Sequence, residues 1–241
     1  MNEKQAVIGI IGGMGPMATV DLFRKMIKCT DAACDQEHLH VLIDNDPHVP
    51  DRTESIRTGS EVPLEYLRRS ALRLQTAGAE LLTIACNTSY YYYDKLCQTP
   101  ELHIPVLHMP LEAAFEAKKR GIKRAGLLAT DGTLLSGSYD RAFAQVGIEL
   151  MKPDTEGQKA LMDIIYNQVK LGRTIDLSKL SPALTRMQTD GCEVFVLACT
   201  ELPIAFAGTD SWRLLDATTV MARAAVKAAG GKLKSEFCHA Q

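Results

Sequence analysis

The chain has 241 residues, which is long enough for one large domain or two small ones, each with its own core. Apolar residues make up 46% of it and charged residues 23%, as is typical of soluble globular proteins. The formal net charge is -2, so the composition excludes the strongly basic surface of a nucleic-acid-binding protein. Residues 1–5 lack the pattern of a signal peptide, and no apolar run approaches the roughly 20 residues that span a membrane. We therefore expect a cytoplasmic protein with neither a nucleic-acid nor a membrane partner.

The first half of the sequence alternates apolar strand patterns with helical periodicity. A strand begins at Ala6 and ends in a glycine-rich turn at residues 12–16. The segment 46–53 contains two prolines and is predicted to be a polar loop. The remaining pattern predicts strands at 40–44, 81–85 and 106–108, and helices at 17–29, 64–77, 90–96 and from 109 to about 120.

The second half repeats this alternation. Strands are predicted at 124–129, 148–151 and 194–198, and helices from about 136, at 157–172, at 181–190 and at 217–229, before a tail that we expect to fray. Strands that alternate with helices in this way indicate an α/β fold with parallel sheets.

Two pairs of segments indicate that the halves arose by duplication. Residues 78–88 align without a gap on residues 191–201, and residues 8–15 align on residues 125–132. Duplication predicts two similar lobes related by an approximate two-fold axis. We assign residues 1–117 and 213–241 to the N-terminal lobe, with the C-terminal helix returning to it, and residues 118–212 to the C-terminal lobe.

The aligned segments place Cys86 and Cys199 at equivalent positions, each after an apolar strand. Ligands of open α/β sheets bind at the carboxyl ends of the strands, so the two thiols are expected on opposite sides of one cleft. Racemisation needs a base on one face of a carbon acid and an acid on the other, and a thiolate and a thiol can fill these roles. The alternative is that both are buried structural cysteines, which are common.

The other five cysteines are interpreted as buried structural residues. The seven cysteines include no Cys-x-x-Cys pair, which argues against a zinc site and a disulfide framework. They stand at positions 29, 34, 86, 97, 192, 199 and 238.

Four short motifs resemble the aspartate/glutamate racemase family: Gly-Gly-Met-Gly-Pro at 12–16, Pro-Asp-Arg-Thr at 50–53, Ala-Cys-Asn-Thr at 85–88 and Ala-Cys-Thr-Glu-Leu-Pro at 198–203. The resemblance extends over about residues 6–229. It implies two Rossmann-like lobes with the active site in the cleft between them, an isomerase without pyridoxal phosphate or a metal, and a homodimer. Glu201 after the second Cys-Thr is similar to the aspartate racemase branch, because glutamate racemases usually carry His there.

The resemblance also implies roles for individual residues. Cys86 and Cys199 are the proton-transfer pair, Arg52 binds a substrate carboxylate, and Lys170 assists with the distal carboxylate. The substrate site is lined by Met14, Gly15, Asn87, Thr88, Thr130, Thr133 and Thr200. The chemistry of Arg52 agrees with its assigned role, because a guanidinium offers a fixed fork for a carboxylate.

Several alternatives stay open at this level. Ser89 and four tyrosines at 90–93 replace a segment where many relatives have His, so the sequence does not decide between aspartate, glutamate and a broader range. Maleate isomerase-like enzymes also use two cysteines, hydantoin racemases belong to the same superfamily, and the related decarboxylases resemble one-cysteine enzymes. A dinucleotide-binding protein is disfavoured, because Gly9, Gly12, Gly13 and Gly15 do not have Gly-x-Gly-x-x-Gly spacing. A non-catalytic small-ligand-binding protein would not need a cysteine on each wall.

Overall fold

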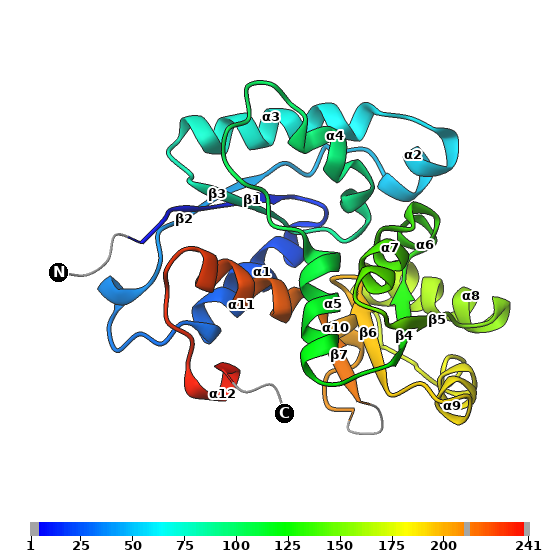
Figure 1. Cartoon of the computed structure of the whole chain (residues 1–241). Helices are drawn as coiled ribbons and strands as arrows, with labels where there is room; N and C mark the ends of the chain where they lie inside the picture. Colours follow the sequence, from blue (N-terminus) through cyan, green and yellow to red (C-terminus); the bar gives the residue numbers. More distant parts are fainter. Residues whose placement is uncertain (1–4, 210–212, 239–241) are drawn as a thin grey trace.

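The computed structural model describes residues 5–209 and 213–238 and contains two parallel β-sheets (Figure 1). The first sheet has the strand order β2-β1-β3 and the second the order β5-β4-β6-β7. Their bounds are β1 Ile8–Gly12, β2 Val41–Asn45, β3 Leu81–Ile84, β4 Arg124–Ala129, β5 Glu149–Met151, β6 Val194–Ala198 and β7 Leu214–Asp216. The predicted α/β fold with two parallel-sheet lobes is therefore confirmed.

Helices cover both faces of the sheets. In the first lobe, α3 packs on one face, while α1 and the C-terminal helix α11 pack together on the other (Figure 1). The helices are α1 Pro16–Cys29, α2 Arg52–Thr58, α3 Val62–Thr76, α4 Tyr93–Cys97, α5 Met109–Lys119, α6 Asp131–Ser136, α7 Ser138–Gln145, α8 Thr155–Asp163, α9 Ser181–Thr189, α10 Leu202–Ala205, α11 Ala217–Ala228 and α12 Ser235–Cys238. Short turns of other helix types are η1 Asp35–Glu37, η2 Thr88–Tyr92 and η3 Ile164–Val169.

The strand register reproduces the duplication. Ile8 of β1 lies opposite Leu81 of β3, and Ala125 of β4 lies opposite Val194 of β6. The sequence alignment pairs Ile8 with Ala125 and Leu81 with Val194, so equivalent residues occupy equivalent places in the two sheets. The central strand and its neighbour are thus the same structural unit used twice.

The predicted strand at 106–108 was wrong in extent. Only Val106 pairs, through a single parallel bridge to Leu82, and this bridge corresponds to the pairing of Leu214 in β7 with Phe195. The ladder stops because His108 already caps α5, its ring Nδ1 accepting a hydrogen bond from the Leu111 N–H. The strand β7 was not predicted.

Three helix predictions also need correction. The predicted loop 46–53 ends early because Asp51 caps α2, its carboxylate accepting the Glu54 N–H, so Arg52 is the first residue of a helix rather than part of a loop. The helix predicted from about 136 begins at Asp131 and is broken by Gly137, which has a positive φ of 62°. The single helix predicted over 157–172 is α8 followed by η3, a π-helical segment.

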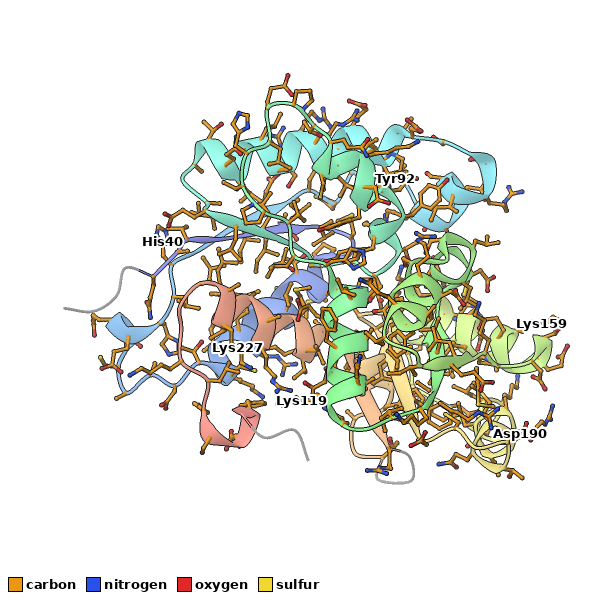
Figure 2. All side chains as sticks on the ribbon, in the orientation of Figure 1. His40, Tyr92, Lys119, Lys159, Asp190 and Lys227 are labelled. Carbon is orange, nitrogen blue, oxygen red and sulfur yellow. The ribbon has the colours of Figure 1, made fainter. Side chains whose placement is uncertain are left out.

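The core continues from one lobe into the other. Buried side chains of β1, β3, β4 and β6 form one apolar cluster with α5 and α11, and a second cluster fills the outer face of the second sheet. Side chains occupy the space between sheets and helices, whereas the labelled Lys159 and Asp190 lie at the periphery (Figure 2). The lobe boundaries stay predictions, and the one at residue 212 lies outside the described residues. Within the described ranges, no helix is long and apolar enough to cross a membrane.

Candidate active site

Cys86 and Cys199 line the same small cavity between the two lobes. Cys199 directly follows β6, and Cys86 comes two residues after the end of β3. Both strand ends point to this cavity because the sheets are parallel and duplicated. The cavity has a volume of about 20 Å³, which is room for about one water molecule. Its lining residues are Met14, Asp51, Arg52, Thr53, Cys86, Asn87, Thr88, Thr130, Tyr166, Lys170, Cys199, Thr200 and Glu201.

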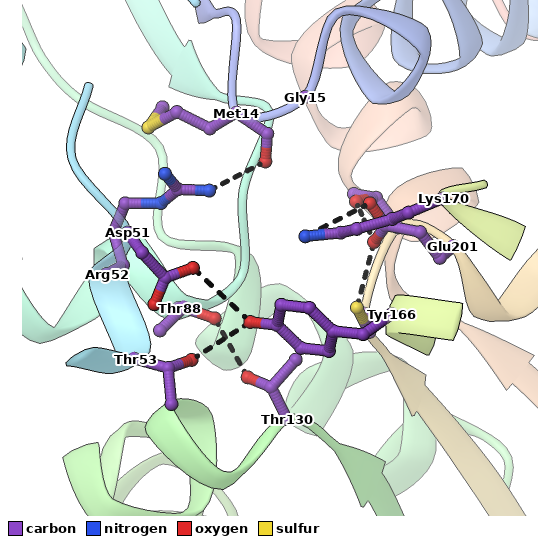
Figure 3. A network of polar contacts seen from close by, with 12 residues as sticks. Met14, Gly15, Asp51, Arg52, Thr53, Thr88, Thr130, Tyr166, Lys170 and Glu201 are labelled. Carbon is purple, nitrogen blue, oxygen red and sulfur yellow. Dashed lines mark hydrogen bonds and ion pairs between the residues drawn. The ribbon is translucent and has the colours of Figure 1, made fainter. Parts of the chain in front are cut away.

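Arg52 is held against the glycine-rich turn on the Cys86 side of the cavity. Its guanidinium donates hydrogen bonds to the carbonyl oxygens of Val49 (3.1 Å) and Pro50 (3.0 Å). A third hydrogen bond goes to the carbonyl oxygen of Met14 at 3.3 Å (Figure 3). Burial disfavours its charge, but the neighbouring Cys86, Asp51 and Tyr166 together outweigh burial, and the pKa of Arg52 is raised above its usual value. Arg52 therefore stays cationic beside Cys86.

The turn that carries Met14 is shaped by contacts within the protein. Gly13 has a positive φ of 92°, and a Cβ built on it would lie 2.1 Å from the carbonyl oxygen of Asp46. The absence of a side chain at Gly13 is thus explained by the close approach of the neighbouring backbone. This contact does not require a bound dinucleotide.

Asn87 is oriented by a tyrosine from the other half of the chain. The buried Tyr139 hydroxyl of α7 donates a hydrogen bond to the Asn87 Oδ1 atom. The Asn87 Nδ2 atom is buried without a hydrogen-bond partner in the described part of the chain. Since a buried amide donor is costly to leave unsatisfied, Asn87 presents a donor that a bound ligand can use.

Three threonine hydroxyls form a hydrogen-bonded triangle at the base of the cavity. Thr88 Oγ1 lies 3.0 Å from the Oγ1 atoms of Thr130 and Thr133, which lie 3.1 Å from each other. Thr130 also caps α6 by accepting the Thr133 N–H. The triangle joins the turn after β3 to the turn after β4, which are contributed by different lobes.

Cys199 has an acidic neighbour. Its thiol donates a hydrogen bond to Glu201 Oε2 at 2.9 Å, and the same oxygen accepts the Thr200 hydroxyl at 3.0 Å. Lys170 Nζ lies 4.0 Å from Glu201 Oε1 (Figure 3). Burial, reinforced by the charge and hydrogen bond of Glu201, raises the pKa of Cys199 well above its usual value.

Tyr166 closes the cavity on its outer side. Its hydroxyl lies 3.4 Å from Thr53 Oγ1 and 3.4 Å from Asp51 Oδ2, and its ring lies 4.3 Å from Lys170 Nζ (Figure 3). Tyr166 also lines an open hollow of about 750 Å³ on its far side, together with residues such as Gln158. The tyrosine side chain therefore separates the small cavity from the outside of the molecule.

Nine of the eleven residues predicted for the site line the cavity. The two exceptions are Gly15, which follows Met14 at the start of α1, and Thr133, which lies behind Thr88 and Thr130. The function of each predicted residue in binding or catalysis stays a prediction.

Sequence reasoning left Asp51, Thr53, Tyr166 and Glu201 out of the predicted site. Asp51 and Glu54 have the spacing of a helix cap, which was a readable signal for the start of α2. Glu201 adjoins Cys199 and Thr200 in the sequence, and it was noted only as a family marker. Tyr166 carries no signal, because only the packing of η3 across the cleft brings its hydroxyl to α2.

The four consecutive tyrosines support the framework of the site. Tyr90, Tyr92 and Tyr93 donate their hydroxyls to backbone carbonyls, at Leu107, Ser60 and Val106 respectively. In the described part of the chain, the residues around the cavity include none of the four. In the same part of the chain, no group of three or more His, Cys, Asp or Glu side chains is placed to hold a metal ion.

Comparison with known proteins identifies the family. The sequence model of the Asp/Glu/hydantoin racemase family matches residues 11–225. The chain belongs to this family. The fold and the isomerase class expected of such racemases are thereby confirmed.

Individual racemases are similar over most of their length. The broad specificity amino-acid racemase RacX of Bacillus subtilis is 26% identical over 200 residues, covering 81% of this chain and 86% of RacX. The structure of Picrophilus torridus aspartate racemase has a TM-score of 0.82 and 30% identity, covering 97% of this chain and 98% of that one. An aspartate racemase homologue from Pyrococcus horikoshii OT3 has a TM-score of 0.76 and 25% identity, covering 95% and 100%.

Proposed function

We propose that this protein racemises an acidic amino acid, aspartate or glutamate, by moving the Cα proton between Cys86 and Cys199. The observation that carries this proposal is that the two thiols line one cavity from equivalent strand ends of two duplicated lobes. Such a pair supplies one acid and one base on opposite sides of a bound carbon acid. The names of the aspartate racemase from Picrophilus torridus and the broad specificity racemase RacX support the reaction class.

In the proposed reaction, one thiolate takes the Cα proton and the electron pair of that C–H bond stays on a planar intermediate. The opposing thiol then gives its proton to the other face of the carbon. The net result is inversion at Cα, with the proton of the pair now on the other sulfur. Two thiols suffice for this exchange, so we expect neither pyridoxal phosphate nor a metal to be required.

The charges around the cavity suit a substrate with two carboxylates. Arg52 and Lys170 come from different lobes and both line the cavity. A guanidinium and an ammonium at two places can each pair with one carboxylate of a dicarboxylic amino acid. The Asn87 amide nitrogen, which has no hydrogen-bond partner among the described residues, and the threonine hydroxyls add neutral hydrogen-bonding groups.

A substrate needs more room than the closed cavity offers, since that volume fits about one water molecule. We therefore expect Tyr166 to swing away from Asp51 and Thr53 during entry and to return afterwards. Its hydroxyl contacts of 3.4 Å are long, so breaking them costs little.

The proposal predicts that both cysteines are needed for turnover. Purified protein is incubated with L-aspartate, L-glutamate or a panel of other L-amino acids in deuterated buffer, and Cα exchange and inversion are followed by NMR and chiral chromatography. We expect inversion with deuterium incorporation for an acidic amino acid. Cys86→Ser and Cys199→Ser should each lower kcat at least about 1,000-fold, because the general acid or base is lost.

Cys34→Ser is the matched control, since Cys34 is an exposed free cysteine outside the cavity. It should keep full activity. Absence of exchange with every amino acid tested would refute the proposed function. Full activity in either of the two cavity variants would refute the two-thiol mechanism while leaving the reaction class intact.

A further inference from the structure

The two thiols are equally buried but have opposite surroundings. Cys86 is 6% exposed and Cys199 is 7% exposed, so the two side chains have nearly the same solvent exposure. Their equivalent positions in the duplicated halves do not distinguish them either. What differs is the charge of the side chains that each sulfur meets.

The surroundings of Cys199 favour a protonated sulfur. An ionised carboxylate only accepts hydrogen bonds, so the 2.9 Å contact to Glu201 Oε2 requires the proton on Cys199. Glu201 is itself fixed by the Thr200 hydroxyl, and its side chain is 12% exposed. The other titratable groups are Lys170 and Tyr166 from η3 and its end, and Tyr139 from α7. Lys170 is the cation among them. Its Nζ atom forms an ion pair with Glu201 Oε1 at 4.0 Å.

The surroundings of Cys86 favour an anion. The cationic Arg52 interacts with Cys86, and its Nε atom is buried without a hydrogen-bond partner in the described residues. The Asn87 Nδ2 atom is a second buried donor that has no hydrogen-bond partner among the described residues. The acidic group on this side is Asp51, whose oxygens are engaged by the Glu54 N–H and the Tyr166 hydroxyl. A fixed cation with spare donors stabilises a thiolate.

We propose that Glu201 is a positioning residue that keeps the resting proton of the pair on Cys199, so that Cys86 is the thiolate that removes the first Cα proton. This inference rests on the proposed function. In the resting enzyme Cys86 accepts the proton from one enantiomer, and Cys199 delivers its S–H proton to the opposite face. The other enantiomer requires the reverse arrangement, in which the Cys199 thiolate lies beside a carboxylate.

Loss of the Glu201 charge should shift the pH dependence of turnover in a defined direction. The negative charge of Glu201 stabilises the protonated form of Cys199, and its removal allows Cys199 to lose its proton at lower pH. Deprotonation of Cys199 removes the catalytic acid, so it sets the basic limb of the kcat/KM profile. Glu201→Gln should therefore move the basic limb down by about one pH unit and leave the acidic limb in place, because a like charge within hydrogen-bond reach shifts a group by about that much.

Cysteine labelling tests the same point without any turnover. Free enzyme is treated with iodoacetamide across a range of pH, and the alkylation of each cysteine is followed by mass spectrometry of its peptide. In the unchanged protein Cys86 should react faster than Cys199. In Glu201→Gln the rate at Cys199 should rise about tenfold near pH 8, because alkylation follows the thiolate fraction. Glu201→Asp retains the charge and should restore slow labelling, and Glu65→Gln on an exposed part of α3 is the control.

The outcomes separate the two proposals. Faster labelling of Cys199 than of Cys86 in the unchanged protein, or identical labelling in Glu201→Gln, overturns the role of Glu201. If the protein fails to racemise any amino acid but shows the expected labelling, the proposed function fails and the charge assignment stands. Circular dichroism of each variant verifies its fold, and if Glu201→Gln unfolds, the relative labelling of Cys86 and Cys199 in the unchanged protein still decides the charge assignment.

Discussion

The side chain of Arg52 both holds backbone segments of the site in place and supplies a positive charge to it. Three backbone carbonyls, from Val49, Pro50 and Met14, accept its hydrogen bonds. These bonds tie the start of α2 to the glycine-rich turn after β1. The same guanidinium keeps a positive charge next to Cys86. The planar group can do this because it offers several donors in a fixed arrangement.

Arg52→Lys should therefore harm the enzyme although it conserves charge. An ammonium is a point charge and cannot reach the three carbonyls together while facing a substrate carboxylate. Loss of one charged hydrogen bond is worth about 2–3 kcal/mol, so we expect kcat/KM for the acidic substrate to fall roughly 100-fold. Arg57→Lys, at an exposed position of the same helix, is the control. Unchanged kcat/KM in Arg52→Lys would show that the fork geometry is irrelevant.

Among the elements, α2 and α6 approach each other closely beside the cavity. A Cβ built on Gly132 would lie 2.6 Å from Thr53 Oγ1 and 2.7 Å from Thr53 Cα, and it would also press on Thr88. The backbone atom in this set cannot rotate away. Glycine at position 132 therefore sets the separation of the two helices, and with it the place of Arg52 and of the threonine triangle.

Gly132→Ala should push α6 away from α2. Overpacking of this kind costs about 1–3 kcal/mol of unfolding free energy, which urea denaturation measures. We also expect kcat/KM to fall by at least about tenfold, because Thr88 and Thr130 would shift relative to Arg52. Leu135→Ala, on the exposed side of the same helix, should change the unfolding free energy by less than about 0.5 kcal/mol. Wild-type stability in Gly132→Ala would contradict the tight contact.

At the scale of the whole molecule, α11 returns after the second lobe and packs on α1 and α5. Buried charges fix it there. The carboxylate of Glu116 in α5 forms ion pairs with Arg120 at 2.9 Å and with Arg223 of α11 at 3.4 Å. The side chains of Glu116 and Arg223 are each 8% exposed. Burial alone would raise the pKa of Glu116, but the two arginines lower it below its ordinary value of 4.5.

Glu116→Gln should destabilise the chain by about 3 kcal/mol, because Arg223 is left as a buried charge without its counter-ion. The folded-state pKa of Glu116 is depressed, so its contribution is present above about pH 4.5 and is lost as the pH falls further. The variant should accordingly lose less stability on acidification than the unchanged protein. Unfolding followed by urea at pH 7 and at about pH 3.5 measures both effects. Glu54→Gln, in an exposed pair with Arg57, serves as the control and should alter the difference between the two pH values much less, because an exposed ion pair contributes little to stability.

The sequence by itself determined the alternation of strands and helices, the duplication and the equivalence of Cys86 with Cys199. These features are local in the chain or depend on repeated residue patterns, and apolar periodicity is a direct consequence of which side chains must be buried. Buried strands such as β1 and β6 are uniformly apolar, so their positions were readable within a residue or two. The helix at α2 was missed because prolines 47 and 50 suggested a loop, although the Asp51 cap begins a helix directly after them.

Only the tertiary structure decided what surrounds each thiol. Tyr166 meets Asp51, and Tyr139 meets Asn87, from positions more than fifty residues away in the chain, with separations of 115 and 52. Glu201 lies two residues after Cys199, yet its carboxylate could have pointed to solvent, and only the fold turns it back onto the sulfur. Periodicity in a sequence reports burial, whereas the direction of a polar side chain depends on which partners the packed lobes bring within hydrogen-bond distance. Duplication therefore placed two identical thiols in one cavity, and the packing around them made their environments different.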